Sequence, residues 1–195
     1  MSDLTTAAIN LLKDLIGLPS FSKQEDKTAD RIGEWFNHYG IPYERDGNNL
    51  WAKNKAFDPQ KPTLLLNSHH DTVKPNTAYT NDPFEAKIVD GKLYGLGSND
   101  AGGALVSLIA LFTHYFNKEN PKYNLLVVAS AEEEIAGDDS LSGLLPKLPK
   151  IDVAIVGEPT EMHLAVAEKG LIVFDAVIKG TPGHAAHPNA DNPIM

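Results

Sequence analysis

The chain has 195 residues, of which 26 are acidic, 17 are basic and none is cysteine, and its formal net charge is -9. No stretch concentrates Lys or Arg, which argues against nucleic acid and anionic membrane surfaces as partners, and the lack of cysteine excludes disulfides and thiolate metal ligands. Because the N-terminus lacks a basic region followed by an apolar core and no apolar run approaches membrane-spanning length, we expect a cytoplasmic protein that is not inserted in a membrane.

Two helices are expected at the start of the chain. Apolar side chains recur at helical spacing from residue 3 to residue 16, and the pattern stops at Gly17. A second such pattern runs from about residue 25 to residue 39 and is followed by Gly40. Since glycine commonly follows the last residue of a helix, both helix ends are supported.

From residue 50 onward, short apolar runs alternate with helical patterns. Asp90 and Gly91 lie between two such runs and form a hairpin signal. Apolar residues cover nearly every position from 101 to 112, which predicts a helix buried against a sheet. The expected strands are 50–53, 63–68, 125–129 and 151–156, the last three of them buried, with a short helix at 140–148. This alternation predicts an α/β fold with a mixed, mostly parallel sheet and helices on both faces.

The pattern changes after Glu158. Residues 164–167 and 171–180 have the pattern of longer strands, so we expect a first domain over residues 1–168 and the beginning of a smaller α+β domain over residues 169–195. The last four residues resemble the start of an element with nothing after it. The chain is therefore expected to be a truncated part of a longer protein.

Acidic and histidine side chains stand directly after the expected buried strands. They are His69 and Asp71 after the first of these strands, Glu132, Glu133 and Glu134 after the second, and Glu158 after the third, with Asp100 just before the buried helix. The carboxyl ends of parallel strands share one edge of a sheet, so these residues are expected to converge. Carboxylate oxygens with imidazole nitrogen suit zinc, cobalt or manganese. The set predicts a two-metal hydrolase site.

Each group taken alone also has an ordinary structural explanation. His69 to Asp71 in isolation is better interpreted as a polar loop, Asp100 as a helix N-cap, and Glu158 as part of a surface turn. The run from Glu132 to Glu134 fits a solvated acidic turn, and His184 lies in a Gly/Pro-rich segment typical of an exposed turn. The joint placement at strand ends favours the metal site, because adjacent like charges are costly without a cation or a shared proton.

Taken in order, the motifs His-x-Asp, Gly-x-Gly-Ser-x-Asp, Glu-Glu, Gly-Glu-Pro-Thr and Gly-His resemble the zinc aminoacylase and carboxypeptidase family. That family includes acetylornithine deacetylase, succinyl-diaminopimelate desuccinylase and aminoacylase. The resemblance covers nearly the whole chain from the first helix onward. It implies a zinc aminopeptidase-like catalytic domain followed by a smaller dimerisation or lid domain, and therefore a homodimer.

The resemblance also implies a metal centre of two divalent ions, Zn²⁺ first, with Co²⁺ or Mn²⁺ as alternatives. His69 and Glu158 would bind one ion, and Glu134 would bind the second. Asp100 would bridge the two. The family's last metal-binding histidine lies in a C-terminal part of the catalytic domain that this chain does not contain, so the second site is expected to be incomplete here.

Three further residues receive catalytic roles from the resemblance. Asp71 would orient His69, Glu133 would act as general base on the attacking water, and His184 would reach into the active site of the partner in a dimer to stabilise the oxyanion. The chain departs from the usual pattern at Ser68, where Gly is common. It departs again at Gly102, where many members carry Lys, and Glu132 stands in place of Asp.

The implied reaction is the release of an acyl group from an N-acyl amino acid. Residues 68–75 and 131–135 are most similar to acetylornithine deacetylase, so N-acetyl- or N-succinyl-ornithine or -citrulline in arginine biosynthesis is the expected substrate. A di- or tripeptidase and succinyl-diaminopimelate desuccinylase are alternatives within the family. A non-catalytic metal-binding or dimerisation module is an alternative from another class.

Overall fold

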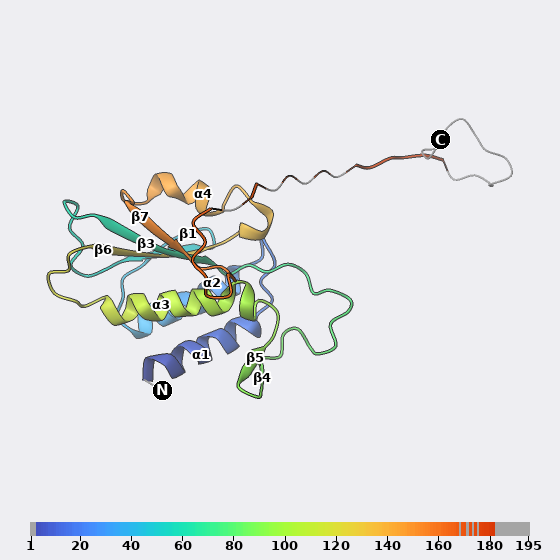
Figure 1. The fold of residues 1–195 in the computed structure, drawn as a ribbon, viewed down its shortest axis with the longest axis horizontal. Helices are drawn as coiled ribbons and strands as arrows, with labels where there is room; N and C mark the ends of the chain where they lie inside the picture. Colours follow the sequence, from blue (N-terminus) through green and yellow to red (C-terminus); the bar gives the residue numbers. More distant parts are fainter. Residues whose placement is uncertain (1–2, 168, 171, 173, 175, 182–195) are drawn as a thin grey trace. The chain divides into compact units, whose positions relative to one another are not determined.

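The computed structural model describes residues 3–167, 169–170, 172, 174 and 176–181. It divides into two compact units, Met1–Met162 and His163–Met195. The α-helices described in the first unit are α1 (Asp3–Ile16), α2 (Asp26–His38), α3 (Gly103–Tyr115) and α4 (Leu141–Leu144). Its strands are β1 (Glu44–Asp46), β2 (Asn49–Lys53), β3 (Thr63–His69), β4 (Lys87–Val89), β5 (Lys92–Tyr94), β6 (Asn124–Ser130) and β7 (Val153–Val156) (Figure 1).

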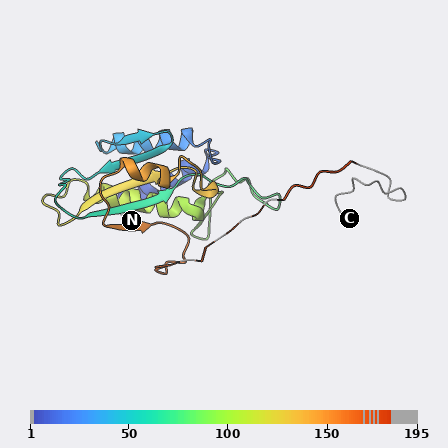
Figure 2. The same cartoon turned by 90° about the horizontal axis from the view of Figure 1, so that it is seen from above.

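Five strands form one mixed sheet in the order β1-β2-β6-β3-β7. Strands β6 and β7 run parallel to β3, whereas β2 is antiparallel to both β1 and β6. In Figure 2 the cyan β1 and β2 lie towards one edge of the sheet and the orange β7 lies at the opposite edge. His69 pairs with Ser130 at the last position of the β3–β6 register, so the carboxyl ends of these strands lie together.

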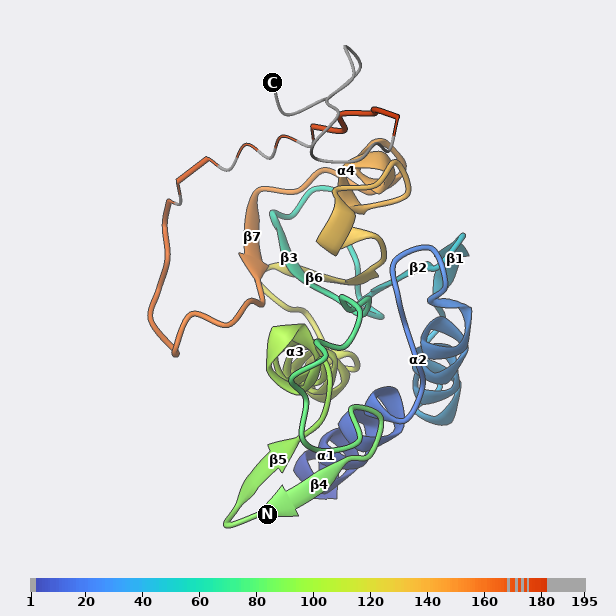
Figure 3. The same ribbon diagram turned by 90° about the vertical axis from the view of Figure 1, so that its right-hand side faces the viewer.

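Helices cover both faces of the sheet, as expected from the sequence. Helices α1, α2 and α3 pack on one face in a core that includes Leu66 and Val127. On the other face Leu65 and Val128 form a second core with Leu144 of α4. Alternate residues of a strand point to opposite faces, which explains why adjacent leucines belong to different cores. Figure 3 shows the two helical layers with the sheet between them.

The hairpin predicted at Asp90 and Gly91 joins β4 to β5, which pair antiparallel. Both turn residues have positive φ angles, 51° and 75°, as a two-residue hairpin turn of type I′ requires. The sequence did not indicate β1, which has three polar residues and lies at the edge of the sheet.

The prediction that the strand at 151–156 is buried is wrong. Val153, Ile155 and Val156 of β7 are 61%, 47% and 54% exposed. The reason is topological, since among the described residues β7 is the last strand of the sheet and pairs only with β3. An apolar run therefore identified the strand correctly but not its surroundings.

The described residues of the second unit contain no helix or strand. Residues 164–167, expected as a strand, have no pairing partner in the described part of the chain, and Leu164 and Val166 are exposed. An isolated strand without a partner is not stable. Part of the expected strand 171–180 and all of 182–195, including His184, lie outside the described residues, and the smaller domain at 169–195 stays a prediction. No described helix is both long and apolar enough to cross a membrane.

Candidate metal centre

The centre begins with His69, the last residue of β3. Its ring is buried, and Nδ1 lies 3.0 Å from the carbonyl oxygen of Asp71 and 3.3 Å from its carboxylate oxygen Oδ1. A carbonyl oxygen can only accept, so Nδ1 carries the hydrogen and donates it. This contact orients the ring so that Nε2 lies 3.1 Å from Asp100 Oδ1.

Asp100 reaches His69 because the loop before α3 lies close to the end of β3. Gly97 has a φ of 72°, and a Cβ atom placed there would lie 2.6 Å from Thr72 Cγ2, so this approach requires glycine. Asp100 itself has an extended backbone, and the N-cap position of α3 is Gly102, which makes no side-chain capping bond. The interpretation of Asp100 as a helix cap therefore does not hold.

Three more carboxylates surround the imidazole. Glu158 Oε2, from the segment after β7, lies 3.7 Å from His69 Nε2, and Glu133 Oε2, after β6, lies 3.9 Å from it. Glu134 joins His69 and Asp100 in a group whose ligand atoms all lie within 4.8 Å of one another. The structure thus brings together every predicted metal-centre residue that it describes.

Asp71 is fully buried and contacts both His69 and the acidic turn of Glu132, Glu133 and Glu134. Its carboxylate accepts the backbone N–H groups of Glu133 and Glu134, at 3.1 Å and 3.2 Å, and the Ser22 hydroxyl at 2.7 Å. Burial opposes the charge, but the hydrogen bonds from His69, Ser22 and the two backbone groups hold the pKa of Asp71 below its ordinary value. Asp71 is therefore an ionised anchor for both the histidine and the acidic turn.

The electrostatics of the site favour a cation. Burial disfavours the charged imidazole, yet hydrogen bonds and charges from Asp71 and Glu158 outweigh it and raise the pKa of His69 to about 11. Burial, and then the neighbouring carboxylates, raise the pKa of Glu133 and Glu134. Excess negative charge of this kind is what divalent ions neutralise, and the oxygen and imidazole donors suit them.

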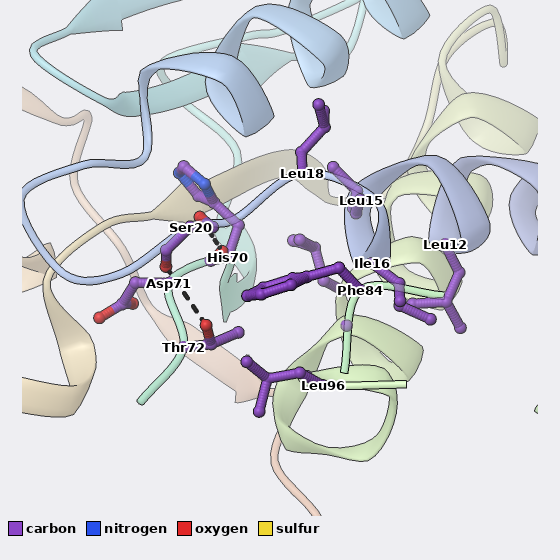
Figure 4. Close-up of a pocket in the computed structure, with 13 residues that line it drawn as sticks. Leu12, Leu15, Ile16, Leu18, Ser20, His70, Asp71, Thr72, Phe84 and Leu96 are labelled. Atoms are coloured by element: carbon purple, nitrogen blue, oxygen red, sulfur yellow. Dashed lines mark hydrogen bonds between the residues drawn. The ribbon is translucent and has the colours of Figure 1, made fainter. Parts of the chain in front are cut away.

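His70 has a structural position that the sequence did not reveal. Its side chain is buried, which lowers its pKa and keeps the ring neutral. Nε2 donates to the carbonyl oxygen of Asn48 at 2.9 Å, so Nδ1 must accept, and the Thr28 hydroxyl lies 2.8 Å from it. The Ser20 hydroxyl donates to the His70 carbonyl at 2.7 Å (Figure 4). His70 thus joins the end of β3 to the segments that flank α2.

A small cavity lies on the α1 side of Asp71. Its volume is about 20 Å³, and its lining includes Leu12, Ile16, Phe84 and Leu96 (Figure 4). That space holds one water molecule at most. It is too small for a substrate.

Two comparisons relate this site to known proteins through the sequence. The family model described as peptidase family M20/M25/M40 matches residues 65–191. Succinyl-diaminopimelate desuccinylase from Buchnera aphidicola subsp. Acyrthosiphon pisum (strain Tuc7) is 32% identical over 208 residues, which cover 98% of this chain and 54% of that protein. The chain thus spans about half the length of this curated relative.

Solved structures agree with the fold. The M20 family metallo-carboxypeptidase Sso-CP2 from Sulfolobus solfataricus matches with a TM-score of 0.62 at 25% identity, over 80% of this chain and 37% of that chain. The YXEP protein of Bacillus subtilis, described as a dinuclear metal binding peptidase, matches with a TM-score of 0.61 at 22% identity, over 80% of this chain and 43% of that chain. Both likenesses support the mixed α/β architecture.

Proposed function

This chain belongs to peptidase family M20/M25/M40, and from that premise we propose that the protein hydrolyses linear amide bonds with divalent ions bound at the carboxyl ends of β3, β6 and β7. One observation carries the proposal: ligand atoms of His69, Asp100 and Glu134 lie within 4.8 Å of one another. A donor set of one imidazole and several carboxylates suits zinc, cobalt or manganese. The cation preference of the site, expressed in the raised pKa of His69, supports the same conclusion.

The proposed centre holds two ions, with zinc as the native metal. His69 and Glu158 would hold the first ion, Glu134 would hold the second, and Asp100 would be a ligand that both ions share. The separation of 3.1 Å between His69 Nε2 and Asp100 Oδ1 supports a shared ligand sphere. When bound, the ions would polarise the amide carbonyl and lower the pKa of a water molecule.

Glu133 is proposed as the general base. Its carboxylate is half exposed and lies 3.9 Å from the imidazole of His69, so it borders the centre while remaining accessible to water and substrate. Burial and the carboxylates around it raise its pKa, which favours a group that takes a proton near neutral pH and returns it. Glu133 would accept the proton of the attacking water at its side-chain oxygen and donate it to the departing amine.

His184 is proposed to stabilise the oxyanion from the partner subunit of a homodimer. This role rests on the Gly-His motif and the family membership, since the residue lies outside the described part of the chain. A positioned donor of this kind contributes roughly 3–4 kcal/mol of transition-state stabilisation in other enzymes.

The proposed substrate is a small N-acyl amino acid. The relative that is 32% identical is a succinyl-diaminopimelate desuccinylase, which favours a succinylated diamino acid. The motifs at residues 68–75 and 131–135 favour N-acetyl- or N-succinyl-ornithine or -citrulline instead. A peptide bond is the remaining candidate, favoured by the carboxypeptidase that matches at 25% identity.

The test is amine release by the full-length protein that contains this sequence, loaded with zinc or cobalt. The panel contains N-succinyl-diaminopimelate, N-acetyl- and N-succinyl-ornithine, N-acetyl-citrulline and dipeptides, with Glu133→Ala as the inactive control. Metal-dependent cleavage of one acylated amino acid supports the proposal and identifies the acyl group. Metal binding without turnover of any amide would contradict it and favour a metal-binding module.

A further inference from the structure

Glu25 is a fully buried carboxylate whose side chain does not cap the helix that it precedes. It occupies the N-cap position of α2 but makes no side-chain capping bond. An N-cap carboxylate ordinarily accepts from the first backbone N–H groups of its own helix. A buried charge persists only where other donors satisfy it, so the partners of Glu25 indicate its role.

Three donors from three segments of the chain converge on Glu25. Oε1 accepts the backbone N–H of Lys23 at 2.9 Å and that of Glu132 at 3.2 Å. Oε2 accepts the side-chain amide of Asn48 at 3.0 Å. Lys23 is a local partner, whereas Glu132 lies 107 positions away along the chain.

The contact with Glu132 completes a regular arrangement in the acidic turn. Three successive backbone N–H groups, those of Glu132, Glu133 and Glu134, each donate to a buried carboxylate. Glu25 accepts the first, and Asp71 accepts the second and third. Glu132 has a φ of 52°, a left-handed conformation that is uncommon for a residue with a side chain. The two carboxylates therefore hold the turn in a conformation it would not readily adopt alone.

We infer that Glu25 is a positioning residue of the metal centre. It fixes the backbone at Glu132 and thereby sets where the side chains of Glu133 and Glu134 stand relative to His69. The inference rests on the proposed function for its kinetic consequence, but its structural consequence concerns the metal-binding geometry alone. Supporting residues that orient metal ligands typically change affinity or activity about 10- to 100-fold when removed.

The contact between Glu25 and Asn48 can be tested by exchanging the carboxylate and the amide between the two positions. In Glu25→Gln the new amide nitrogen faces the amide nitrogen of Asn48, so two donors oppose each other. In Asn48→Asp two carboxylates oppose each other. The double variant Glu25→Gln/Asn48→Asp restores one donor and one acceptor with the original total charge. It keeps an oxygen on residue 25 for the backbone N–H of Glu132, and the new carboxylate still faces Arg45, whose Nη2 donates to Asn48 at 3.2 Å.

The test measures zinc affinity by chelator competition and the visible absorption spectrum of the cobalt-loaded full-length protein, together with kcat and KM on the best amide. We expect Glu25→Gln to weaken binding of at least one ion about 10-fold, to change the cobalt spectrum and to lower kcat with little change in KM. Asn48→Asp should show a similar defect, and the double variant should recover to within about threefold of wild type. Glu34→Ala, an exposed carboxylate of the same helix, is the control.

A purely structural role would produce a different pattern. If Glu25→Gln lowers the melting temperature but keeps the metal affinity and cobalt spectrum of Glu34→Ala, the inference is wrong. Defects in the two single variants that add in the double variant would also overturn it. If the wild-type protein binds metal but cleaves none of the amides, the proposed function fails, and the affinity and cobalt spectrum still decide the role of Glu25.

Discussion

Both ends of the parallel strands carry polar clusters, but the two clusters differ in how completely their groups are paired. The amino-end cluster consists of Asn54, Asp58, Thr63, Asn124 and Asp152. The buried amide of Asn124 donates to the Asp58 carbonyl at 2.8 Å and accepts the Asp58 N–H at 2.9 Å. Asp152 accepts the Thr63 N–H at 2.9 Å, and Asn54 accepts a backbone N–H of β6 at 2.8 Å. Donors and acceptors balance there, as in a structural connection.

The carboxyl-end cluster is unbalanced. Its members are His69, Asp71, Asp100, Glu133, Glu134 and Glu158. Among the described residues, His69 is the one cationic side chain that lies within 4.0 Å of Asp100, Glu133 and Glu158. Folding alone gives no reason to collect so many carboxylates at one edge, because like charges destabilise one another. The contrast teaches that charge imbalance, more than polarity, distinguishes a site for a ligand from a structural cluster.

The largest expected effect is on turnover. Glu133→Ala should lower kcat by about 100- to 10,000-fold, since a general base contributes that much. Its zinc content should stay at the wild-type level, because Glu133 is proposed to act on water and not to bind metal. Amine release and metal analysis on the same preparation check both parts. Loss of metal in this variant would show that the roles of Glu133 and Glu134 are exchanged.

A pair of substitutions compares the two clusters directly. Asp71→Ala removes the acceptor of the Ser22 hydroxyl and of the backbone N–H groups of Glu133 and Glu134, and it should lower the free energy of unfolding by about 3–5 kcal/mol. Asn124→Ala at the other end should cost about 2–4 kcal/mol for the same reason. Only Asp71→Ala should also weaken zinc binding. Urea unfolding and chelator competition measure the two effects, and equal zinc affinities in the two variants would remove the distinction between the clusters.

Glu134→Gln tests whether the carboxyl-end cluster binds metal, by measuring how much zinc raises the stability of the protein. In the wild type, zinc at 100 times its dissociation constant should add about 2.7 kcal/mol of stability through mass action. The variant should lose part of this gain. Its metal-free form should be as stable as the wild type or slightly more stable, because a carboxylate with a raised pKa is unfavourable when charged. Melting curves with and without zinc provide the test, and a less stable metal-free variant would contradict it.

The smallest effect is expected at Asp152 and depends on pH. The hydrogen bond from Lys150, and then that from the Thr63 N–H, lower the pKa of Asp152 from 3.8. A carboxyl whose folded-state pKa is depressed stabilises the fold above its unfolded value and loses this contribution as the pH falls through the folded value. Asp152→Asn should therefore reduce the acid dependence of stability and leave zinc affinity unchanged. Unfolding curves at pH 7 and pH 3 measure it, and a steeper loss on acidification would be the opposite result.

Much of the fold could be predicted from the sequence because its signals are local. Helical periodicity identified α1 and α2 to within one or two residues, and the Asp90-Gly91 signal identified the hairpin. The convergence of His69 with Glu133 and Glu158 also followed from one general rule, that the carboxyl ends of parallel strands share an edge. These inferences needed no knowledge of which side chains touch.

The features that were missed depend on contacts between distant residues. The role of Glu25 follows from a bond to Glu132, and the role of Asn48 follows from bonds to Glu25 and His70, none of which leaves a local pattern. The exposure of β7 is a property of sheet order, which an apolar run does not encode. The sequence offered one signal for Glu25, a Glu at the start of a helix in place of the usual Ser, Thr, Asp or Asn.

The most direct test of the central claim is an anomalous difference map at the zinc edge from crystals of the zinc-loaded full-length protein. Two bound ions predict two peaks about 3.5–4 Å apart. One should lie beside His69 and Glu158 and the other beside Glu134, with Asp100 between them. A single peak, or peaks away from the carboxyl ends of β3, β6 and β7, would contradict the account.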